Sequence, residues 1–282
     1  MDPDQKVIFS LVEGFVVGER RGISLKEAFE LRDREMISLV GAGGKTTLMF
    51  RLARELKASG KRVVTTTTTK IREPSPEETE ALGVESDPER LKAFAEKYLG
   101  PGRHITLASE RIEGKKLKGL SPEAVVMLWG LDGIDYLIVE ADGAAGRPVK
   151  APREKEPVIP SATTLVVAIV GMEAVGTKVD ELHVFQPERI SKLTGVPLGG
   201  KLDEEAVAVL MTHPEGIWKG APSTSRVVAF LNKVDLPNAL EKARSLAREI
   251  LKREARIERI ILGQLEKEPS VLEIRETGFG CV

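Results

Sequence analysis

The chain has 282 residues, of which 41% are hydrophobic, so it can bury a sizeable core as one large domain or as one domain with a lobe. Its 42 Lys and Arg balance 43 Asp and Glu, and aromatic residues make up only 4%, which argues against nucleic acid or an anionic membrane surface as a partner. The single cysteine, Cys281, excludes a disulfide framework and a cysteine-based metal site, and since no apolar run approaches a membrane span we expect a cytoplasmic protein.

Residues 1–35 predict a helical N-terminal extension, followed by a main domain at 36–282. The helical pattern of the extension is interrupted at Gly22. Beyond this break, Ser24 is expected to act as a helix N-cap, with Glu27 completing a capping box.

A phosphate-binding loop is the most informative motif in the chain. An apolar run at 36–39 precedes a glycine turn that ends in Lys-Thr, and a helical pattern follows at 48–56. Backbone N–H groups of such a turn and of a helix N-terminus can surround anionic oxygens without side chains in the way. We expect Lys45 to reach the terminal phosphates of a nucleotide and the Thr46 hydroxyl to hold Mg²⁺. The nucleotide-binding residues expected here are Gly41, Ala42, Gly43, Gly44, Lys45, Thr46 and Thr47.

The spacing of this loop departs from the usual pattern. Leu39 stands where the first glycine should be, and the loop read from Gly41 is two residues shorter, a spacing similar to that of the Mur ligase family. The alternative interpretation is a tight turn between a strand and a helix, in which Lys-Thr has no binding role.

Threonines end the next predicted strand, which begins at 61–64. Five of them occupy positions 65–69 and are followed by Lys70. Hydroxyls at the carboxyl end of a strand can hydrogen-bond to phosphate oxygens, so Thr68, Thr69 and Lys70 are candidates for contacting a second substrate. A run of β-branched residues is equally typical of a partly buried strand.

The segment 74–119 differs in character from its surroundings. It is charged and is broken by Pro and Gly, with a helix predicted at 88–99 and a short strand at 104–108. We interpret it as an inserted helical or lid segment.

Two carboxylates follow the next buried strand, predicted at 136–140. Four apolar residues lead to Glu140, and Asp142 comes just beyond the strand. P-loop enzymes place a carboxylate in this position beside Mg²⁺ and the γ-phosphate. We therefore expect Thr46, Glu140 and Asp142 to hold the metal. Lys45, Glu140 and Asp142 are the expected catalytic residues, and the alternative is that the two acids are ordinary strand-end residues.

A basic, proline-rich stretch follows these acids. Arg147, Lys150 and Arg153 recur every three residues, so on an extended path they would line one face. Such a face suits an anionic small molecule as second substrate. The alternative is a solvated linker with scattered charge.

The last motif follows a short apolar run at 226–231. Asn232, Lys233 and Asp235 form an Asn-Lys-X-Asp element, which resembles the guanine-recognition element of GTPases. A carboxylate at Asp235 can accept hydrogen bonds from the guanine N1–H and exocyclic amine, and Asn232 can tie this loop to the phosphate loop. Adenine binding is the alternative.

The order of these elements predicts an α/β fold. Further strands are expected at 165–170 and 257–262, and further helices at 188–193, 204–211 and 238–254. Alternating strands and helices favour a doubly wound, mostly parallel sheet of the P-loop NTPase type, with its sites at the carboxyl ends of the strands.

Taken together, the motifs resemble the YqeC family of accessory proteins for selenium-dependent molybdenum hydroxylases. The resemblance extends from about Ile23 to Gly263 and departs from the family pattern at Lys155, where the family often has His. It implies a cytoplasmic P-loop nucleotide hydrolase that assists maturation of a selenium-containing molybdenum cofactor, with maturation proteins as partners. The segments that carry the resemblance are 38–47, 66–71, 139–144, 149–152, 156–160, 214–216, 219–222 and 232–235.

We therefore expect an Mg²⁺-dependent nucleoside triphosphate hydrolase, with GTP favoured over ATP. Two other classes remain open. The first is a kinase, ligase or nucleotidyl transferase that acts on an anionic small molecule. The second is a non-enzymatic chaperone or scaffold that binds nucleotide as a structural ligand.

Overall fold

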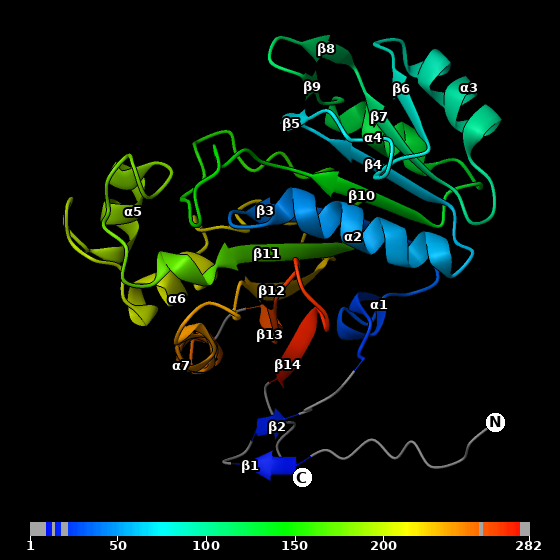
Figure 1. The fold of residues 1–282 in the computed structure, drawn as a ribbon. Coiled ribbons are helices and arrows are strands. Elements are labelled where there is room, and N and C mark those ends of the chain that lie inside the picture. Colours follow the sequence, from blue (N-terminus) through cyan, green and yellow to red (C-terminus); the bar gives the residue numbers. More distant parts are fainter. Residues whose placement is uncertain (1–9, 13–14, 18–21, 254–255, 277–282) are drawn as a thin grey trace.

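The computed structural model describes residues 10–12, 15–17, 22–253 and 256–276, and within them nine strands form one sheet (Figure 1). The strand pairs are parallel except the last, in which β14 is antiparallel to β13. In sheet order the strands are β14 (Val271–Glu276), β13 (Ile257–Gly263), β12 (Arg226–Asn232), β11 (Leu165–Gly171), β3 (Glu35–Gly41), β10 (Tyr136–Glu140), β4 (Val63–Thr67), β7 (His104–Ala108) and β6 (Ala81–Val84). The predicted doubly wound, mostly parallel α/β fold is confirmed.

Helices cover both faces of this sheet. They are α1 (Leu25–Ala28), α2 (Lys45–Ala58), α3 (Pro88–Tyr98), α4 (Pro122–Trp129), α5 (Pro187–Thr194), α6 (Glu204–Thr212) and α7 (Ala239–Leu251). Side chains alternate across the central strand β3: Ile37 and Leu39 pack with α1 and α2, whereas Met36 packs with α3 and α4, and Val40 with α5 to α7. Helices on both faces explain why every residue of β3 is buried.

The N-terminal region differs from the predicted helical extension. Residues 10–12 and 15–17 form two short antiparallel strands, β1 (Ser10–Val12) and β2 (Phe15–Val17), so the helical prediction is wrong there. The capping box of Ser24 and Glu27 is present and begins α1, which is only four residues long. The remaining residues before Gly22 lie outside the described part.

The predicted insertion at 74–119 is divided between two structures. β6, α3 and β7 extend the main sheet, because β7 pairs in parallel with β4. The rest contributes β8 (Glu110–Ile112) and β9 (Lys116–Lys118), which join β5 (Lys70–Arg72) in a separate three-stranded sheet. The candidate lid therefore includes fewer residues of 74–119 than expected. It consists of this small sheet, which lies beside β4 (Figure 1). Across the described residues, no helix has the length and apolar character needed to cross a membrane.

His104 is a structural residue on β7. Its ring is 2% exposed, shares a hydrogen bond of 2.9 Å with the Thr65 hydroxyl and packs against Phe50. Burial lowers the pKa of His104 to about 4, because charging the imidazole inside the core costs solvation free energy. We therefore read it as neutral and unrelated to metal binding.

This histidine should make folding sensitive to acid. The unfolded chain binds the proton near pH 6.5 and the folded chain only near pH 4, so stability falls as the pH drops through that window. The loss attributable to His104 is about 3 kcal/mol once the pH is below both values. Urea unfolding of wild type and His104→Gln near neutral pH and near pH 4 tests this. The variant should lose distinctly less stability on acidification, and equal losses would contradict the assignment.

Candidate functional site

The glycine turn between β3 and α2 packs directly against two neighbouring strand ends. Gly43 and Gly44 have φ values of +83° and +141°, which side chains with a Cβ rarely adopt. A Cβ at Gly43 would lie 2.3 Å from the Gly171 nitrogen, and one at Gly44 would lie 2.3 Å from the Asn232 amide nitrogen. The sequence therefore needs glycine here both for the turn and for the close approach of β11 and β12.

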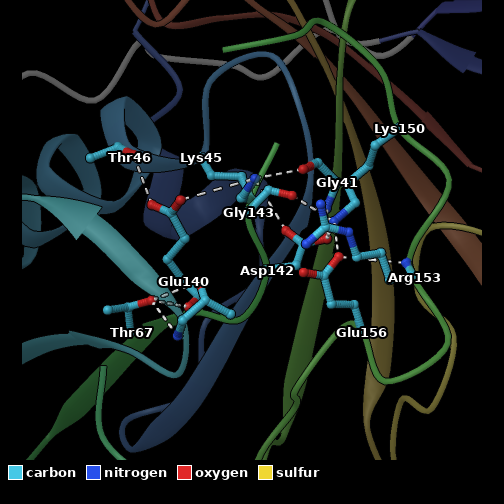
Figure 2. Close-up of polar contacts among 11 residues, drawn as sticks. Gly41, Lys45, Thr46, Thr67, Glu140, Asp142, Gly143, Lys150, Arg153 and Glu156 are labelled. Atoms are coloured by element: carbon cyan, nitrogen blue, oxygen red, sulfur yellow. Dashed lines mark hydrogen bonds and ion pairs between the residues drawn. The ribbon is translucent and has the colours of Figure 1, made fainter. Parts of the chain in front are cut away.

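Lys45 is folded back over this turn. Its ammonium group donates to the carbonyl oxygen of Gly41 at 2.5 Å and lies 3.1 Å from Asp142 Oδ1 and 4.0 Å from Glu140 Oε1 (Figure 2). The side chain is almost completely buried. The structure thus brings together the three residues predicted to be catalytic, because β10 lies next to β3 in the sheet.

Asp142 is held between two lysines. Its Oδ2 accepts a hydrogen bond from the backbone N–H of Gly41 at 3.1 Å and lies 3.0 Å from the Lys150 ammonium. Lys45 approaches the other oxygen, and all three side-chain groups are buried. A buried carboxylate needs such compensation, since an isolated charge in the interior is strongly unfavourable. Asp142 is therefore enclosed by protein cations, and this position does not suit direct metal ligation.

Lys150 does not lie on an exposed basic face. The prediction that Arg147, Lys150 and Arg153 line one face is therefore wrong for Lys150. Its side chain is fully buried, and its ammonium also contacts Gly143 O at 2.6 Å and Glu156 Oε2 at 2.9 Å. A backbone bridge joins Lys150 to Phe185, and the burial of the ammonium group places this side chain inside the protein and away from any exposed basic face. Arg147 donates instead to Glu181 O, and the Arg153 guanidinium stacks on the Phe185 ring at 4.9 Å.

Glu140 and Thr46 offer the oxygen ligands that a hard cation prefers. The Thr46 hydroxyl donates to Glu140 Oε2 at 2.7 Å. Burial raises the pKa of Glu140, while Lys45 and the Thr46 hydroxyl act in the opposite direction. Within the described residues, no cluster of three His, Cys, Asp or Glu side chains could hold a metal ion. The donor set therefore fits Mg²⁺ that draws its remaining ligands from phosphate and water, as this ion commonly does.

The Asn-Lys-X-Asp element lies at the end of β12, beside the glycine turn. The Asn232 amide donates to Gly43 O at 2.8 Å, and its oxygen accepts from the Leu265 N–H at 3.1 Å. Asn232 therefore joins the phosphate loop to the loop after β13. The sequence predicted its contact with the phosphate loop but not its contact with the loop after β13. Lys233, in a left-handed conformation, pairs with Glu173.

Asp235 lies at the rim of the same site. Its Oδ2 lies 2.8 Å from the Lys267 ammonium, and this hydrogen bond lowers the pKa of Asp235, keeping it ionised at neutral pH. The sequence analysis missed Lys267, Leu265 and Glu173. The loop after β13 could have been anticipated only from its place at the carboxyl end of a parallel strand.

A single cleft of about 1430 Å³ connects these motifs. Thr68, Thr69 and Lys70 all line the cleft. The Thr68 hydroxyl donates a hydrogen bond to Val158 O at 2.7 Å. The expected site residues that line the cleft are Gly43, Gly44, Lys45, Thr46, Thr47, Thr68, Thr69, Lys70, Glu140, Arg147, Arg153, Asn232, Lys233 and Asp235. Arg72, Lys116 and Lys118 of the small sheet also line it and were not predicted.

The family model and the curated relative that match this chain point to the same family. The YqeC protein family model matches residues 37–188. YqeC of Escherichia coli (strain K12) is 33% identical over 239 residues, which cover 84% of this chain and 90% of that relative. Among solved structures, the signal recognition particle 54 kDa protein of Aeropyrum pernix K1 in complex with GDP has a TM-score of 0.31 and 17% identity. That alignment covers 84% of this chain but only 37% of the solved chain.

The two-lysine arrangement around Asp142 can be tested by stability. Lys150→Met should destabilise the fold by about 3–5 kcal/mol, because it removes one of the buried cations beside the carboxylate. Adding Asp142→Asn should recover part of this loss, since the neutral amide no longer needs two cations. Urea unfolding gives the free energies of both variants and of Asp142→Asn alone.

Glu156→Gln is the matched control for this cycle. It alters the other carboxylate partner of Lys150, which is partly exposed and can be solvated after the change. We expect it to cost much less than Lys150→Met. If Glu156→Gln costs as much, and Asp142→Asn rescues nothing, Lys150 serves mainly to hold the 150–156 loop.

Proposed function

The chain belongs to the YqeC family, and we propose that it binds a nucleoside triphosphate with Mg²⁺ at the glycine turn and hydrolyses the γ-phosphate. The observation that carries this proposal is the convergence of Lys45, Thr46 and Glu140 in the lining of the cleft. A lysine charge, a hydroxyl and a carboxylate are the groups that phosphoryl transfer requires, because it depends on positioning and charge neutralisation more than on covalent chemistry.

Lys45 must move for this function. In the structure its ammonium rests on Gly41 O and Asp142, and a bound triphosphate would compete for it. Lys150 also lies 3.0 Å from Asp142, so the carboxylate would keep one counter-ion if Lys45 left it. We infer that Asp142 acts through Lys45, by holding it at the turn, and not on the nucleotide itself.

Thr46 and Glu140 would hold the magnesium ion. When bound, Mg²⁺ would supply positive charge to the phosphate oxygens. Burial raises the pKa of Glu140 and so favours its protonated form, whereas a bound cation would favour the ionised form. Nucleotide binding should therefore release protons in proportion to the fraction of Glu140 that is protonated.

Guanine is the proposed base. Asp235 has one carboxylate oxygen engaged by Lys267, which leaves the other to accept from a base edge, and guanine offers a matching pair of donors. Lys233 lines the cleft and pairs with Glu173, and we expect its stem to lie along the base. GTP as the substrate rests on this geometry, with ATP as the alternative.

The biological role proposed here comes from the family resemblance. It supports assistance in maturation of a selenium-containing molybdenum cofactor in the cytoplasm, with maturation proteins as partners. A second candidate is transfer of a phosphoryl or nucleotidyl group to an anionic small molecule, favoured by the continuation of the cleft past the glycine turn to Lys70 and Arg153. A nucleotide-binding scaffold would differ from both by showing ligand-induced thermal stabilisation without turnover.

Replacement of Lys45 tests the nucleotide site. Lys45→Ala removes the one cation of the turn and should weaken binding of Mg²⁺ and GTP by several kcal/mol, or about a hundredfold or more, and abolish phosphate release. Lys57→Ala, on the last turn of the same helix and paired with Glu80, is the matched control and should behave as wild type. Calorimetric titration and a phosphate-release assay measure both properties. Unchanged affinity and turnover in Lys45→Ala would refute the proposal.

Replacement of Asp235 tests the base. Asp235→Asn should weaken GTP binding and strengthen binding of xanthosine triphosphate, because the amide presents a donor where the carboxylate presented an acceptor. Competition binding with GTP, ATP and xanthosine triphosphate measures the change, with the exposed Asp132→Asn as control. Equal affinity of the wild-type protein for GTP and ATP would overturn the guanine assignment while leaving the phosphate site intact.

A further inference from the structure

The small sheet carries an unusual arrangement of charge. In the antiparallel pair of β5 and β9, Lys70 stands opposite Lys118, and Arg72 stands opposite Lys116. The central residues of the two strands, Ile71 and Leu117, are buried, so alternation along the strands puts all four cations on the opposite face.

Like charges directly opposite one another across a strand pair are destabilising. Two of the four cations have nearby carboxylates: Arg72 pairs with Glu78, and Lys118 lies 3.4 Å from Glu110. Throughout the part of the chain that the structure describes, no carboxylate lies within ion-pair distance of Lys70 or Lys116. The small sheet therefore keeps uncompensated positive charge where a neutral or acidic residue would cost less.

This cationic face is held in place beside the glycine turn. Gly119, which follows β9, donates its N–H to Thr69 O at 2.7 Å and packs against the backbone of Thr67. The Thr67 hydroxyl in turn donates to Glu140 O at 2.7 Å. Arg72 lies over the ring of Phe50 on α2 at 5.4 Å. Backbone contacts at one end and a packing contact at the other therefore fix the small sheet to the strand and helix that carry Glu140 and Lys45.

All four cations line the same cleft as the glycine turn, and Arg153 extends the positive charge on the neighbouring wall. Five acids also line the cleft, but within the described residues none of them lies within ion-pair distance of Lys70 or Lys116. Unpaired cations on a concave surface attract anions. The acids are Glu140, Glu156, Glu173, Asp235 and Glu266. The balanced net charge of the chain disfavours a long polyanion, so we favour a small ligand.

We propose that this face of β5 and β9 is a second anion-binding site, which takes the phosphate-type oxyanion of a small molecule and faces the nucleotide across the cleft. The proposal rests on the proposed function, because it assigns the acceptor or effector that shares the cleft with the triphosphate. Lys70 and Lys116 provide its uncompensated charges, with Arg72 and Lys118 beside them. A triphosphate on the glycine turn leaves this face available to a separate ligand.

The test uses the full chain saturated with Mg²⁺ and a non-hydrolysable GTP analogue, so that the glycine turn is occupied. Inorganic phosphate is then titrated by calorimetry, with citrate in a parallel arm to separate phosphate from carboxylate recognition. We expect saturable phosphate binding that weakens about tenfold in Lys116→Glu and in Lys70→Glu. Lys115→Glu is the matched control, because Lys115 is exposed on the adjoining turn and does not line the cleft; it should bind phosphate as wild type does.

The melting temperature provides a second measurement, which separates a binding role of these lysines from a structural one. Lys70→Glu converts the like-charge pair with Lys118 into an opposite-charge pair, so its melting temperature should be equal to or higher than that of wild type while phosphate affinity falls. Absence of saturable phosphate binding, or equal affinity in all variants, overturns the proposed site while GTP binding persists. Loss of GTP-analogue binding by the wild-type protein would instead contradict the proposed function.

Discussion

The site depends on the compensation of one buried carboxylate by two ammonium groups. Asp142 lies between Lys45 and Lys150 and also accepts the N–H of Gly41, so it fixes the glycine turn and its lysine at once. With a single lysine, that lysine would be bound too strongly to leave, since its departure would strand a buried charge. The second lysine makes the first available to a ligand.

The parallel sheet explains how distant segments meet there. β3, β10, β11 and β12 end at the same edge, and each contributes one part of the site: the glycine turn, the carboxylates, the wall at Glu173 and the Asn232 loop. In a parallel sheet with helices on both faces, the central residues of the strands are buried, and ligand-binding residues lie at the carboxyl ends of the strands. Gly43 and Gly44 allow these ends to approach within contact distance, because any Cβ there would overlap with β11 or with Asn232.

The sequence predicted what is local and missed what is formed by distant residues. The glycine turn, the acidic strand end and the Asn232 element are each formed by consecutive residues at one strand end, so their positions could be predicted without the fold. The burial of Lys150 could not be predicted in this way, because it depends on contacts with Asp142 and Glu156 that only the folded chain brings together. The pairing of β5 with β9 joins segments more than forty residues apart, and β14 adds an antiparallel edge, so neither followed from alternation along the chain. The short strands β1 and β2 lacked the length that separates strand from helix patterns.

We propose that one triphosphate site is formed where the glycine turn, the Glu140 strand end and the Asn232 element meet. Hydrogen–deuterium exchange of the full chain, with and without Mg²⁺ and a non-hydrolysable GTP analogue, tests this proposal most directly, because it locates the ligand without assuming turnover. We expect slowed exchange in peptides that cover 41–47, 139–143 and 232–236, and no change in α3. Protection that omits 41–47, or that appears only elsewhere in the chain, would contradict it.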